Sequence, residues 1–292
     1  MTNTSLMAIK TETIDIIANK VKDLQSKGDI QFPADYSPEN AMRAAWLVIQ
    51  DCKDRSQNAA LDVCDKNSVQ NSLFRMVIQG LNPVKGQCYF IVYGKTLTLS
   101  VSPYGDMHIA KTMDPSIKDI FADVVYKGDT FKYVKKNGKN IITEHCQELG
   151  NIDKAQIIAA YATVLFQDGS EYSVIKTFDE IKQSWKQSPL NPVGANGEVS
   201  ATSTHGKFTA EMCKKTLIHA ICKPIIRSSS DRSILGEIYA ETEQASHEAS
   251  IEAEIEEKAN ALEIDFDVET GEVMPEALAE IPVIEDEDGL PN

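Results

Sequence analysis

The sequence predicts a chain of mixed helix and strand, in which a helical lobe precedes a strand-rich segment and a further long helix. Three observations predict this order. Apolar residues recur with helical spacing through the first 80 residues. Apolar and polar residues alternate in several short runs between positions 88 and 178, which predicts strands. A helical pattern with one cationic side follows between positions 205 and 222.

The helical lobe is predicted to contain three helices. Apolar spacing places the first from about Thr11 to Ser26. The second begins at Ser37-Pro38-Glu39, because Ser is a good N-cap, Pro suits the first helical position and an acidic residue suits the positive end of the helix dipole. The third begins between Asp65 and Ser68 and ends at Gly80. We expect this lobe to make contacts between subunits.

Strand patterns begin after the lobe. Cys88–Val92 and Thr96–Ser102 read as a hairpin that turns at Tyr93-Gly94-Lys95, and the polar alternation of its second strand predicts one face in water. Tyr104-Gly105-Asp106 starts a short helix that runs through Lys111. Further strands are predicted at about Phe121–Tyr126, Thr130–Val134, Gln156–Phe166 and Glu171–Phe178, with Ala159–Val164 as a central strand, and a helix follows at Phe178–Gln187.

Charge is distributed unevenly along the chain, whose formal net charge is -15. From Glu237 onward there are 19 Asp or Glu and one Lys, whereas the preceding 236 residues hold 28 Lys or Arg and 25 Asp or Glu. An acidic tail is therefore joined to a mildly basic body, and the acidic total does not exclude a nucleic-acid partner. Residues 238–258 could form a weak surface helix, and we expect the rest of the tail to be disordered.

Two basic segments could form the two sides of a groove for single-stranded nucleic acid. Gln79–Asp106 carries lysines and tyrosines, and His205–Arg227 carries cations spaced four apart along a helix that is expected to end or kink at Pro224. Lysines bind phosphates and aromatic rings stack on bases. The candidate DNA-binding residues are Lys85, Tyr89, Tyr93, Lys95, Tyr104, Lys111, Lys127, Lys132, Lys207, Phe208, Lys214, Lys215, His219, Lys223 and Arg227.

Signals for catalysis are weak. Gly94-Lys95-Thr96 lacks the earlier glycine of a nucleotide-binding P-loop, and the histidines show no metal-ligand spacing with cysteine or carboxylate. We therefore expect a protein that is not an enzyme and needs no cofactor. Two alternatives stay open: a filament-forming DNA-binding scaffold with no further activity on the bound strand, and a metal-dependent nuclease built from distant acidic residues.

The Gln79–Asp106 stretch, the turn at 127–131 and the His205–Lys223 helix together resemble the RecT family of phage single-strand annealing proteins, in particular members from Gram-positive (Listeria-type) phages. The resemblance covers roughly Asp35 to Arg227. It implies an α+β annealing-protein core with a small antiparallel sheet, a hairpin and flanking helices. It also implies ATP-independent binding and annealing of single-stranded DNA, retention of the annealed duplex, and assembly into rings or helical filaments.

The predicted organisation has three parts: residues 1–80 as the helical lobe, 81–236 as the α+β DNA-binding core and 237–292 as the acidic tail. We expect the tail either to keep the basic body soluble or to bind a basic partner, such as a host protein or the phage 5′→3′ exonuclease that the family resemblance implies. The sequence shows no signal-peptide pattern and no apolar run long enough for a membrane span. We therefore expect the protein in the cytoplasm of a bacterial host cell, with no membrane partner.

Overall fold

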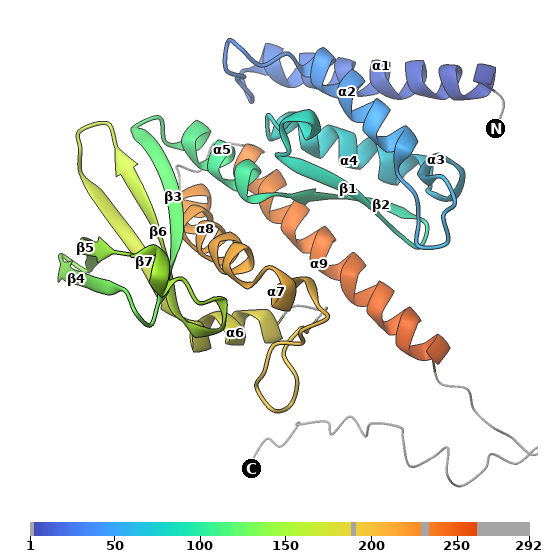
Figure 1. Ribbon diagram of the computed structural model, residues 1–292. Helices are drawn as coiled ribbons and strands as arrows, with labels where there is room; N and C mark the ends of the chain where they lie inside the picture. The colour runs from blue at the N-terminus through green and yellow to red at the C-terminus, as the bar shows by residue number, and fades with distance from the viewer. Residues whose placement is uncertain (1–2, 188–190, 229–233, 262–292) are drawn as a thin grey trace, which may run out of the picture.

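The computed structural model of the chain describes residues 3–187, 191–228 and 234–261 (Figure 1). A group of helices with a two-stranded hairpin forms one side of the molecule, and a five-stranded sheet with its covering helices forms the other. Helix α9 lies between these two sides in Figure 1. The fold is therefore α+β, with antiparallel sheets, as the sequence predicts.

The helical lobe contains α1 (Asn3–Lys27), α2 (Pro38–Asp51), the short α3 (Ala60–Val63) and α4 (Lys66–Ile78). Both predicted N-caps are present, since the side chain of Ser37 accepts a hydrogen bond from Asn40 N and that of Asp65 from Ser68 N. Met42, Trp46 and Leu73 are fully buried between the helices. The buried side chains of the lobe belong to the same hydrophobic core as those of the rest of the described chain.

The predicted hairpin is confirmed as β1 (Cys88–Tyr93) and β2 (Thr96–Val101), which pair from Tyr93↔Thr96 to Cys88↔Val101. Gly94 in its turn has φ 54°, a left-handed value that glycine adopts at little cost. Helix α4 packs against β2, where Ser72 Oγ donates to Leu97 O at 2.7 Å. A 3-10 turn, η1 (Pro83–Lys85), precedes the hairpin, and the predicted short helix follows as α5 (Pro103–Met113).

The five-stranded sheet has the order β3-β6-β7-β5-β4, and all its pairs are antiparallel. The predicted central strand lies within β6, between β3 and β7. The strands expected from the sequence do not include β5, which pairs with β4 across an Asn-Gly turn at Asn137 and Gly138 with φ 51° and 80°. The strands are β3 (Ile117–Tyr126), β4 (Thr130–Lys136), β5 (Lys139–Cys146), β6 (Ile157–Phe166) and β7 (Glu171–Thr177), with 3-10 turns η2 (Leu149–Asn151) and η3 (Lys154–Gln156) between β5 and β6.

Three helices follow the sheet: α6 (Phe178–Lys186), α7 (Thr204–Lys207) and α8 (Thr209–Ser228). Helix α8 packs across β3, β6 and β7 and buries Cys213, Leu217 and Ile221. The prediction of one helix from 205 to 222 is wrong, because the backbone of Phe208 leaves the helical region at φ -127°, ψ 47° and separates α7 from α8. The helix also does not end at Pro224, which lies inside α8.

Helix α9 (Ile234–Ala261) corrects two expectations. It is not a weak surface helix, because Tyr239 and Thr242 are 0% and 1% exposed. It packs against β2, where Thr98 is buried, so the face of the hairpin predicted to lie in water is partly covered. The tail predicted to begin at Glu237 therefore starts with 25 helical residues, and residues 262–292 lie outside the described part of the chain.

No helix in the described ranges has both the length and the apolar character that crossing a membrane requires.

Candidate functional site

A groove follows one side of α8 and consists of two adjoining cavities that share Ser184, Lys215 and His219 as lining residues. The first, of about 710 Å³, lies between the end of α6, residues 202–205 and α8. The second, of about 400 Å³, lies between β2, α5, α8 and α9. We call the two together the α8 groove. Segments distant in sequence thus meet along one helix.

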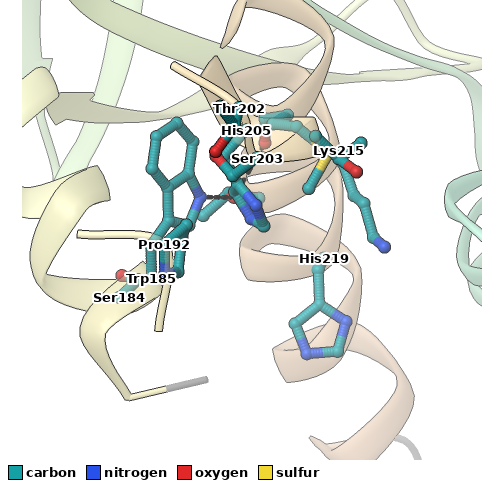
Figure 2. Close-up of a pocket in the computed structure, with 11 residues that line it drawn as sticks. Ser184, Trp185, Pro192, Thr202, Ser203, His205, Lys215 and His219 are labelled. Carbon is teal, nitrogen blue, oxygen red and sulfur yellow. Dashed lines mark hydrogen bonds between the residues drawn. The ribbon is translucent and has the colours of Figure 1, made fainter. Parts of the chain in front are cut away.

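The first cavity has aromatic and hydroxyl groups on its walls. Figure 2 shows Trp185 on the α6 side, Lys215 and His219 on the α8 side, and His205 between them. Trp185 Nε1 donates to Thr216 Oγ1 at 2.8 Å, and the Trp185 ring meets the His205 ring edge to face with centroids 4.8 Å apart. Burial and the nearby positive charge of Lys215 lower the pKa of His205, which favours its neutral form.

Four cations follow each other along α8 at intervals of one helical turn: Lys215, His219, Lys223 and Arg227. Lys215 is exposed where the two cavities meet. The other three converge on a single carboxylate of α9. Glu243 Oε1 lies 3.0 Å from His219 Nε2 and 3.1 Å from Lys223 Nζ, and Oε2 lies 3.0 Å from Arg227 Nη2.

On its other side, His219 contacts a residue of α5. His219 Nδ1 lies 3.2 Å from Asp106 Oδ2, and the hydroxyl of the buried Tyr239 donates to Asp106 Oδ1 at 2.9 Å. Asp106 is itself only 4% exposed. The predicted meeting of the 80–106 segment with the 205–227 segment therefore occurs, through α5 packed on α8 and through this Asp106–His219 contact.

These contacts shift the protonation equilibria of the cluster. Hydrogen bonds to Asp106 and then to Glu243 raise the pKa of His219 to about 9, so it carries a positive charge at neutral pH. Burial alone would raise the pKa of Glu243, but its hydrogen bond to His219 and the surrounding positive charges outweigh burial and lower that pKa to about 2. Burial, with the charges of Asp106 and Glu243, raises the pKa of Tyr239.

The structure brings together only some of the predicted DNA-binding residues. Lys215 and His219 line the α8 groove, and Lys223 and Arg227 continue its cationic row. The three tyrosines do not line either cavity, although Tyr89 and Tyr104 are exposed elsewhere. The remaining candidates outside both cavities are Lys85 in η1, Lys95 in the β1–β2 turn, Lys127 in the β3–β4 turn, Lys207 in α7 and the exposed Phe208.

Three further candidate lysines already have carboxylate partners. Lys111 Nζ lies 2.9 Å from Asp119 Oδ1, and Lys132 Nζ lies 2.7 Å from Glu144 Oε2. Lys214 Nζ lies 3.5 Å from carboxylate oxygens of both Asp123 and Glu211. A role for these lysines in DNA binding stays a prediction, and it would require each ammonium group to share or exchange its partner.

Sequence reasoning missed Trp185, Tyr239 and Glu243. For α9 a signal was present, because Leu235, Tyr239, Thr242 and Ser246 recur at helical spacing within an otherwise acidic segment. The high acidic content concealed this stripe. Nothing in the local sequence links Glu243 to cations of α8, since that contact depends on how two helices pack.

The groove lining combines two cations, Lys215 and His219, with the carboxylates of Asp106 and Glu243, and hydroxyl groups from Thr202, Ser203, Ser246 and Ser250 lie around them. Within residues 3–187, 191–228 and 234–261, no three His, Cys, Asp or Glu side chains gather in a way that could hold a metal ion. Fold and groove together define an α+β protein with a polar cleft at which Lys215 is exposed.

The chain belongs to the RecT family, whose model matches residues 39–260. Membership implies a DNA-binding, single-strand annealing protein of recombination, which binds single-stranded DNA and associates with itself. The match extends beyond the resemblance stated above, which ended at Arg227, and it includes nearly all of α9. Helix α9 is therefore part of the family's common region. A search of curated proteins found no match.

Proposed function

We propose that the protein holds single-stranded DNA along the α8 groove and anneals complementary strands without ATP, as a ring or helical filament. The observation that carries this proposal is the row of cations on α8, of which Lys215 is exposed at the junction of two adjoining cavities. Annealing forms base pairs and breaks no covalent bond. The protein therefore needs to supply only contacts that ignore sequence and leave the bases free.

The mechanism follows from charge and repetition. Cations in the groove lower the repulsion between two phosphate backbones and so accelerate the encounter of complementary strands. A row of subunits would add many weak phosphate contacts, and avidity would hold both the strand and the new duplex. In this proposal residues 1–80 supply subunit contacts, residues 81–236 bind DNA, and the acidic tail contacts host proteins or a phage 5′→3′ exonuclease in the bacterial cytoplasm.

The test is the annealing of two complementary oligonucleotides that carry a fluorophore and a quencher, measured without ATP. Quenching should be faster with protein than without it, and Lys215→Glu should slow it. Lys118→Glu, the same charge change at an exposed position of β3 outside the groove, serves as the matched control. A wild-type rate equal to the protein-free rate would favour the scaffold alternative. Shortened strands after incubation with Mg²⁺ would favour the nuclease.

A further inference from the structure

The two edges of the five-stranded sheet are built differently. The sheet ends with β3 on one side and β4 on the other. On β3, side chains occupy amide groups: Asp119 Oδ1 accepts from Ile120 N at 2.9 Å, and Asp123 Oδ1 accepts from Val124 N at 2.8 Å. Where β3 ends, Asp129 Oδ2 accepts from Tyr126 N at 2.8 Å. An edge whose amides are already bonded cannot readily pair with another strand.

The β4 edge lacks such protection among the described residues. Pairing with β5 satisfies one side of β4, and within the described ranges no side chain bonds to an amide on its other side. Almost every residue of β4 is exposed, and Tyr133 and Val134 are 52% and 50% exposed. A strand with free backbone groups and exposed apolar side chains is a template for pairing.

The charge of this edge selects the strand that could pair with it. Lys135 and Lys136 have no carboxylate at ion-pair distance within the described residues, whereas the neighbouring Lys132 is paired with Glu144. Lysines on an edge strand oppose pairing with a neutral or cationic strand. An anionic strand would instead gain opposite-charge pairs across the new ladder.

One segment of this chain has the required pattern. In residues 262–269, Leu-Glu-Ile-Asp-Phe-Asp-Val-Glu, apolar and acidic residues alternate without exception. Such period-2 alternation gives an extended chain one apolar and one acidic face. Alternation also divides β4: Phe131 and Tyr133, whose rings lie 6.1 Å apart, share one face with Lys135, and Lys132, Val134 and Lys136 lie on the other. The apolar face of the added strand would meet the aromatic side chains, and its acidic face would meet Lys132 and Lys136.

We propose that residues 262–269 of one copy add as a strand to the β4 edge of a second copy. Figure 1 shows α9, which immediately precedes this segment, ending on the side of the molecule away from β4. A segment that leaves one side of each copy and binds another side of the next makes a head-to-tail interface, and repetition of that interface produces rings or filaments. The inference rests on the self-association in the proposed function and adds a second contact surface to the one proposed for residues 1–80.

The experiment uses charge reversal in the full-length protein. The tail variant Glu263→Lys, Asp265→Lys, Asp267→Lys, Glu269→Lys has a basic tail and a basic hairpin. In the hairpin variant Lys135→Glu, Lys136→Glu, the tail and the hairpin are both acidic. Sedimentation velocity should show the wild type as assemblies and each variant alone with at least a twofold lower weight-average mass. A 1:1 mixture of the two variants should regain the wild-type distribution, because each tail then meets a hairpin of opposite charge.

The control for the hairpin variant is Lys118→Glu, Lys186→Glu, two exposed lysines in β3 and α6, which should assemble as the wild type does. A mixture that sediments as the sum of its parts would overturn the proposal, as would variants that assemble normally alone. So would a hairpin variant that loses oligonucleotide binding yet assembles normally, because β4 would then be a DNA surface. The annealing rate of the wild type is measured separately, so failure of the interface is distinguishable from failure of the annealing function.

Discussion

Replacing Glu243 by Gln tests whether the cations of α8 face DNA. Glu243 contacts His219, Lys223 and Arg227 at 3.0–3.1 Å and has a side chain only 19% exposed. Its pKa falls from 4.5 to about 2 in the folded protein. That difference corresponds to about 3 kcal/mol of stabilisation by the ionised form at pH 7. Glu243→Gln should therefore lower the free energy of unfolding by up to about 3 kcal/mol.

The same substitution should strengthen binding to single-stranded DNA. It leaves the three cations without their shared carboxylate and makes them available to phosphates. For single strands the slope of log K against log salt becomes more negative by about 0.7 for each added phosphate contact, so three contacts would change it by about 2. Fluorescence anisotropy of a labelled oligo-dT at several salt concentrations measures both affinity and slope.

Glu241→Gln is the matched control. Glu241 lies two residues away on the same helix, has a side chain 57% exposed, and pairs with Arg75 of α4 at 3.5 Å. The Glu241→Gln substitution removes the same negative charge, but the residue it replaces is paired with Arg75 and not with the cations of α8. If Glu243→Gln destabilises the fold but binds DNA with the affinity and salt slope of Glu241→Gln, the His219–Lys223–Arg227 row does not contact phosphates, and that part of the groove assignment is wrong.

Three further predictions concern the same region. Lys215→Glu should weaken oligo-dT binding and flatten its salt dependence, measured by anisotropy; unchanged binding would exclude the cavity junction as a DNA contact. Tyr239→Phe should lower stability to urea by about 1–3 kcal/mol, because the buried Asp106 carboxylate loses a donor; no change would mean that another donor replaces it. The pair of His219 and Glu243 should make stability depend on pH at both ends. The raised pKa of His219 predicts stability that is present below pH 6.5 and lost as pH rises towards about 9, and the lowered pKa of Glu243 predicts stability that is present above pH 4.5 and lost as pH falls towards about 2. Thermal unfolding across pH checks this, and His219→Gln should remove the alkaline loss.

Local signals were sufficient for much of the fold. Caps at Ser37 and Asp65, the glycine turn at Gly94 and the apolar run of β6 each act within a few residues, so the sequence displays them directly. The break between α7 and α8 at Phe208 could not be predicted from the sequence, because it depends on how α7 packs against the preceding loop. A Cβ at Gly206 would lie 2.3 Å from Ser200 O, so that approach needs glycine and the neighbouring loop in place.

The candidate site was predictable only as a set of cations. Spacing of four residues correctly placed Lys215, His219, Lys223 and Arg227 on one side of α8. It could not show that Glu243 forms ion pairs with three of them, because that residue lies on a helix whose acidic composition suggested solvent exposure. Tyr89 and Tyr93 of the hairpin line neither cavity, so their part in DNA binding stays a prediction.

The most direct test of the account is photo-cross-linking of the wild-type protein to a single-stranded oligonucleotide that carries 5-iodouracil at every second position, followed by peptide mapping. Cross-links should concentrate in the peptides that line the α8 groove, at residues 100–106, 184–187, 202–219 and 239–250. Cross-links confined to β1, the β1–β2 turn or the β4–β5 hairpin, with none on α8, would contradict the account.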